Sequence, residues 1–178
     1  MVSRSIVEKG QVHDLSNSGS GACASIEEAV EHYRELVRGN RDAFLPDLAM
    51  SLNNQANLQS EVGKRAEALA SIEEAVEHYR ELVRGNRDAF LPNLVTSYST
   101  WGLILDGQEG IEKFAEGLQL ITPFAQKLPQ AHLPLAVNLR QTYIQACQKA
   151  GVEPDAALLQ PIAELMQAER AASDEPES

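Results

Sequence analysis

Histidine is the residue type in this chain that most often binds metal ions, and the positions of the four histidines do not indicate that role. His32 and His78 occupy the same position of a duplicated segment, beside an apolar stripe, whereas His13 and His132 are isolated. No two of them have the spacing of a metal-binding pair. We therefore expect structural or exposed histidines, and no metal site.

The two cysteines indicate neither catalysis nor a disulfide framework. Cys23 lies near His32 in the sequence, but no motif of an activated nucleophile surrounds it. Cys147 follows an apolar stripe residue, so we expect it to pack as a small hydrophobic side chain. Two cysteines favour a reducing compartment, because disulfide-stabilised proteins carry more of them. We expect no enzymatic activity.

A glycine-rich segment, Gly19-Ser-Gly-Ala-Cys-Ala24, superficially fits the G-x-G-x-x-A pattern of nucleotide-binding loops. Such a loop follows a strand of a parallel sheet, and no strand pattern precedes this one. The segment also lacks the lysine of a phosphate-binding loop. We interpret residues 1–22 as a flexible lead-in and expect no cofactor.

Composition excludes several classes of protein. The 178 residues include 15 Lys and Arg against 26 Asp and Glu, a formal net charge of −11. A phosphate backbone is bound by clustered cations, so this balance argues against a nucleic-acid partner. No apolar run approaches the roughly 20 residues of a membrane span, and no secretory signal is evident at the N-terminus. We expect a soluble, cytoplasmic protein that ends in an acidic tail over residues 172–178.

An internal repeat dominates the sequence. Residues Ala24 to Pro46 and residues Ala70 to Pro92 are identical over 23 positions, at an offset of 46. A third, degraded copy of the junction occurs at Leu133-Pro134. Repeats of this length are typical of solenoid architectures. Identity over 23 residues also indicates a recent duplication of the gene segment.

The repeated unit has the periodicity of α-helices. Apolar residues recur at steps of three and four, and no stretch alternates long enough to predict a strand. Gly63, Gly107 and Gly151 separate the predicted helices, while Pro46 and Pro92 are expected in the first turns of helices. The fold class is therefore all-α. One such apolar stripe consists of Leu69, Ile72, Val76, Tyr79 and Val83.

One unit, Ser51 to Tyr79, carries a recognisable pattern of large and small residues. Its apolar and small positions resemble those of the tetratricopeptide repeat (TPR) family, in the long-repeat form similar to kinesin light chains and to bacterial arrays attached to signalling ATPases and caspase-like proteases. Ile72 replaces the family's aromatic residue, and Arg80 stands where the family has a proline. The matching positions are Leu52, Ala56, Gly63, Ala68 and Ala75.

The resemblance implies a TPR-like α-solenoid of antiparallel helical hairpins, wound into a right-handed superhelix. We expect it to span residues 23–171. Ser25-Ile-Glu-Glu28 matches a capping box and predicts the start of a lone helix. The expected elements are this lone helix at 25–38 and hairpins at 44–84, 90–128 and 133–170.

The resemblance also implies a non-catalytic protein–protein interaction module. In the family, first helices line a concave groove that holds a partner peptide. Asn53 and Asn57 map to that groove, and Ser99 and Arg140 are counterparts in later units. Trp101 replaces Gln55, so it is expected either to reach the groove partly or to pack internally.

The lone helix needs a neighbour that the repeats do not supply. Three explanations stay open: the lead-in folds over it, another chain does so through self-association, or the chain is part of a longer array. The last makes the protein a regulatory or sensor segment of a larger signalling protein, associated with an ATPase or a protease. The apolar stripe in question is Ile26, Val30, Tyr33 and Val37.

Glutamates gather on the repeated segment, at Glu27, Glu28 and Glu31 and at the same positions of the second copy. A solvated outer face that keeps the protein soluble is the simpler interpretation. A docking patch for a basic partner is the alternative.

Overall fold

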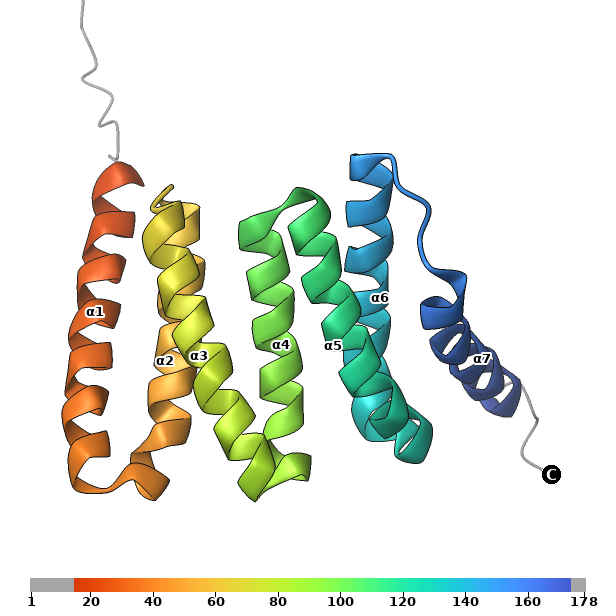
Figure 1. The fold of residues 1–178 in the computed structure, drawn as a ribbon, viewed down its shortest axis with the longest axis horizontal. Coiled ribbons are helices and arrows are strands. Elements are labelled where there is room, and N and C mark those ends of the chain that lie inside the picture. Colours follow the sequence, from red (N-terminus) through yellow and green to blue (C-terminus); the bar gives the residue numbers. More distant parts are fainter. Residues whose placement is uncertain (1–14, 174–178) are drawn as a thin grey trace, which may run out of the picture.

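Seven α-helices and no strand make up residues 15–173, the part of the chain that the computed structural model describes (Figure 1). The predicted all-α fold class is therefore confirmed. The helices are α1 (Leu15–Gly39), α2 (Arg41–Glu61), α3 (Arg65–Gly85), α4 (Arg87–Leu105), α5 (Gly107–Lys127), α6 (Pro129–Ala150) and α7 (Ala156–Ser173).

The helices pack in chain order. Each one contacts the next, and α2 also contacts α4, α4 contacts α6, and α5 contacts α7. In Figure 1 they follow one another along the long axis of the molecule, from α1 at one end to α7 at the other. The apolar core is therefore shared between sequence neighbours, and α2, α4 and α6 form a row in which α4 contacts both of the others.

Asparagine caps, not prolines, begin the helices α2 and α4. The side chains of Asn40 and Asn86 accept hydrogen bonds from the backbone N–H groups of Ala43 and Ala89. An asparagine oxygen satisfies an N–H group that the first turn leaves without a partner. Pro46 and Pro92 consequently lie inside the helices, so placing them in the first turn was wrong.

Helix α1 begins at Leu15, ten residues before the predicted start at Ser25. The preceding turn supplies a partner for the hydroxyl of Ser25, which donates to the carbonyl of Gly21 at 3.1 Å instead of capping the helix. The expected flexible lead-in over 1–22 is therefore wrong for residues 15–22. Residues 1–14 of that lead-in, and residues 174–178 of the acidic tail, lie outside the described part of the chain.

Glycines allow α4 and α5 to approach closely. A Cβ atom on Gly110 would lie 2.4 Å from the carbonyl oxygen of Gly102, and one on Gly102 would lie 2.6 Å from the ring of Phe114. Both distances are shorter than any normal van der Waals contact. The second contact is with a side chain, whereas the first is with backbone that cannot rotate away.

Gly110→Ala is therefore expected to lower the free energy of unfolding by up to about 2 kcal/mol. Overpacking costs about 1–3 kcal/mol, and the gain in helix propensity of about 1 kcal/mol offsets part of it. Urea denaturation, followed by the fluorescence of the single tryptophan Trp101 on α4, measures the change. The control is Gly85→Ala, where a Cβ meets nothing within 4 Å. Its free energy of unfolding should stay equal or rise, and equal losses in both variants would contradict the packing argument.

Candidate functional site

A hollow of about 250 Å³ opens between α2 and α4, with one residue of α3 at its base. Asn53, predicted from the sequence as a groove residue, lines it. Sequence reasoning missed the other polar residues there, because they are not at the family's groove positions. The lining residues are Met50, Asn53, Asn54, Tyr79, Pro92, Asn93, Thr96 and Ser97.

The side chain of Asn53 carries an unused hydrogen-bond acceptor. The residue is half-buried, and its Oδ1 atom is inaccessible to solvent and has no hydrogen-bond partner among the described residues. A neighbouring amide, Asn93, donates to the hydroxyl of Tyr79 at 3.4 Å, and burial raises the pKa of that hydroxyl. Buried polar atoms in folded proteins are normally paired, so the amide of Asn53, once its side chain turns towards the hollow, offers an acceptor to a ligand N–H group.

A second hollow, of about 270 Å³, lies between α4 and α6. Leu103, the counterpart of Asn57 in the next unit, lines it and is 63% exposed. At its edge Lys149 Nζ lies 2.9 Å from Asp106 Oδ2, and this ammonium group lowers the pKa of the Asp106 carboxyl. The lining residues are Gly102, Leu103, Asp106, Phe114, Thr142, Gln145, Ala146 and Lys149.

Three predicted groove residues line neither hollow. Asn57 on α2 and Ser99 on α4 are half-buried, as is Arg140 on α6. The Nε atom of Arg140 is buried and has no hydrogen-bond partner among the described residues. The structure therefore brings one predicted groove residue, Asn53, to a hollow and places these three outside both hollows.

Trp101 packs between helices instead of lining a hollow. Its ring stacks on Tyr98 with centroids 6.2 Å apart, and Lys113 Nζ of α5 lies 4.5 Å from its centroid. Tyr98 in turn accepts a hydrogen bond from Arg80 of α3. These contacts fit the packing alternative for Trp101 and place the ring on the side of α4 that meets α3 and α5.

The described residues hold no group of three or more histidine, cysteine or acidic side chains arranged for a metal ion. Cys23 and Cys147 are both buried and unpaired thiols. Within the same part of the chain, the helices are too short or too polar to cross a membrane.

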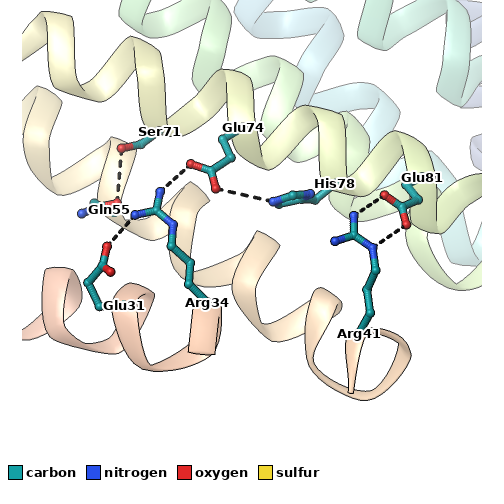
Figure 2. A network of polar contacts seen from close by, with 8 residues as sticks. All are labelled: Glu31, Arg34, Arg41, Gln55, Ser71, Glu74, His78 and Glu81. Carbon is teal, nitrogen blue, oxygen red and sulfur yellow. Dashed lines mark hydrogen bonds and ion pairs between the residues drawn. The ribbon is translucent and has the colours of Figure 1, made fainter. Parts of the chain in front are cut away.

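Arginines of α1 and α2 form ion pairs with glutamates of α3 (Figure 2). Arg34 lies 2.6 Å from both Glu74 and Glu31, and its pKa is raised by the hydrogen bond to Glu74. Arg41 donates to Glu81 through Nε at 2.9 Å and through Nη2 at 2.6 Å. This two-point hydrogen bond lowers the pKa of the Glu81 carboxyl.

Comparison with models of known protein families, with curated protein sequences and with solved structures finds no match for this chain.

The Arg41–Glu81 pair gives a pH-dependent contribution to stability. A lowered folded-state pKa means that the contribution is complete above the ordinary carboxyl value of 4.5 and is lost as the pH falls through the lowered value. The Glu81 side chain is 47% exposed, so the pair is worth at most about 1 kcal/mol. We expect Arg41→Gln to raise the pKa of Glu81 towards 4.5, as measured by NMR titration of its carboxyl carbon.

Arg38→Gln is the matched control for this titration. It removes the same charge from an exposed arginine that makes no ion pair with any described residue. The pKa of Glu81 should stay low in this variant. An equal rise in both variants would mean that general charge, and not the hydrogen bond, sets the value.

Proposed function

We propose that this chain is a non-catalytic protein–protein interaction module, a TPR-like solenoid that binds a partner peptide along the row of helices α2, α4 and α6. The observation that carries the proposal is Asn53, which lines the hollow between α2 and α4 and whose buried Oδ1 atom has no hydrogen-bond partner among the described residues. An extended peptide presents backbone N–H groups that such an acceptor binds.

The chemistry of the first hollow suits the backbone of a peptide better than a particular side chain. Asn53, Asn54 and Asn93 supply amide groups, which both donate and accept hydrogen bonds, and Thr96 adds a hydroxyl. Met50 is 47% exposed beside them and offers a flexible apolar contact. Amides carry no charge, so binding there would not depend strongly on the charge of the peptide.

The second hollow provides a place for an apolar side chain further along the same peptide. Leu103 is exposed there, and Phe114 and Ala146 also line it. The adjacent Lys149–Asp106 pair gives the rim polar groups of both signs. A polar contact in one hollow and an apolar anchor in the next would fix both the register and the direction of a bound peptide.

Asn53→Ala/Asn54→Ala is expected to weaken peptide binding about 30-fold, because each amide hydrogen bond contributes about 1 kcal/mol. The probes are peptides selected from a displayed random library on the wild-type protein. Fluorescence anisotropy measures their dissociation constants after circular dichroism has confirmed that both proteins are equally helical.

The control for this experiment is Gln119→Ala/Gln126→Ala, which removes two exposed amides from α5. Its dissociation constants should match those of the wild type. Peptides that bind the Asn53/Asn54 variant as tightly as the wild type would place binding elsewhere and overturn the proposal.

A further inference from the structure

The internal duplication places one helical sequence in two environments. Residues 24–39 of α1 and 70–85 of α3 are identical. Helix α3 packs between α2 and α4, whereas α1 packs on α2 at the end of the row (Figure 1). The positions buried in α3 but not in α1 are Ser71 against Ser25, Ile72 against Ile26, Ala75 against Ala29 and Tyr79 against Tyr33.

The side chains that pack on α3 show which chemical groups its surface binds. The hydroxyl of Ser71 lies 2.8 Å from Gln59 Oε1 and 3.3 Å from Gln55 Oε1, both on α2. Glu74 and Glu81 hold Arg34 and Arg41, which are seven residues apart (Figure 2). Helix α3 therefore binds the pair of helices α1 and α2 through two glutamines and two arginines.

The same acidic groups stand on α1 without such partners. Glu28 and Glu35 are the copies of Glu74 and Glu81, and His32 is the copy of His78, which lies 3.6 Å from Glu74. Glu28 and Glu35 are exposed and make no ion pair with any described residue. They line a shallow hollow of about 520 Å³ whose residues are Ala24, Glu27, Glu28, Glu31, His32 and Glu35.

We infer that this face of α1 is a docking surface for a helical partner, a helix pair that presents two arginines seven residues apart beside a row of amide and small apolar side chains. The inference concerns a surface separate from the peptide-binding hollows. Two arginines suit it better than two lysines, because Arg34 bridges two carboxylates at once and Arg41 binds one carboxylate through two nitrogens.

A second copy of this chain is a poor candidate for that partner, because its own matching arginines are engaged. Arg34 and Arg41 hold Glu74 and Glu81. Their copies are also occupied: Arg80 donates to Tyr98 and lies 3.8 Å from Glu116, and Arg87 lies 5.1 Å from the ring centroid of Phe124. A partner with unengaged arginines fits the surface without breaking any of these contacts.

The first test uses a labelled synthetic peptide of residues 30–62 of this chain, which carries the two arginines and the two glutamines in their natural spacing. We expect saturable binding to the full chain by fluorescence anisotropy. Glu28→Arg/Glu35→Arg should weaken it at least about ten-fold, since it places like charges opposite each other. The control, Glu73→Arg/Glu77→Arg, makes the same change of charge at exposed positions of α3 and should change binding less than about three-fold.

Exchanging the charges between the peptide and the protein distinguishes specific ion pairs from attraction due to net charge. The peptide with Arg34→Glu/Arg41→Glu should bind Glu28→Arg/Glu35→Arg more tightly than it binds the wild-type protein. This peptide should bind the control protein, Glu73→Arg/Glu77→Arg, no more tightly than it binds the wild-type protein. Equal gains with both proteins would show that net charge alone governs binding and would overturn the inference.

A second measurement does not depend on a short peptide folding. Residues 24–69 are duplicated directly ahead of Ala24, which gives the original α1 the same preceding sequence as α3. In this longer chain Glu28→Arg/Glu35→Arg in the original α1 should lower the urea midpoint, while in the natural chain it should not. Equal effects in both chains, together with no binding of the peptide, overturn the inference.

Two other occupants of this surface, a second copy of the chain and residues 1–14, would each give a distinct experimental result. If sedimentation shows a wild-type dimer that Glu28→Arg/Glu35→Arg dissociates, a second copy occupies the surface. If the peptide binds only after residues 1–14 have been deleted, that segment of the chain occupies it. Either result overturns the assignment to a separate partner that presents two arginines.

Discussion

The width of the apolar face on each helix is the constraint on which the packing depends. On α3, Ile72 belongs to a buried cluster with Val30 of α1, Leu52 of α2 and Ile104 of α4, and Val76 belongs to a second cluster with Ala49 of α2 and Leu94 of α4. Both clusters draw residues from the helix before α3 and from the helix after it. A helix of this kind therefore needs a neighbour before it and a neighbour after it, and removing a buried side chain such as Ile72 would cost about 2–5 kcal/mol. The row of helices follows from this requirement, repeated along the chain.

The helices were predictable because their apolar periodicity is a local property of the sequence, and the structure confirms that Ile72, Val76 and Tyr79 are buried. The helix starts were less predictable, because an asparagine after a glycine suits both the end of one helix and the cap of the next. Asn40 has φ −150° and ψ 89° and serves as that cap.

The candidate site was predictable only in part, because a groove is made by residues from different helices. Asn53 follows from the repeat pattern, and the structure places it in a hollow. Asn93 and Thr96 line the same hollow from α4, and their contribution depends on how closely α2 and α4 approach. That approach is set by packing, which one repeat unit does not encode. Trp101 likewise contacts Lys113 of α5, and one repeat unit does not encode this contact between helices.

The duplicated helix shows which structural features follow from the peptide's sequence and which follow from the helices packed against it. Ser25 and Ser71 lie in identical peptides and both lie inside helices, so the two packing environments leave the helical state unchanged. Their hydroxyls nevertheless differ: Ser25 donates to a carbonyl of its own helix, whereas Ser71 donates to a glutamine of α2. A mid-helix serine bonds back to its own turn when nothing else is in reach. The unpaired glutamates on α1, Glu28 and Glu35, are therefore copies of the glutamates with which α3 binds the arginines of α1 and α2. The contacts of α3 consequently indicate which groups the surface of α1 can bind.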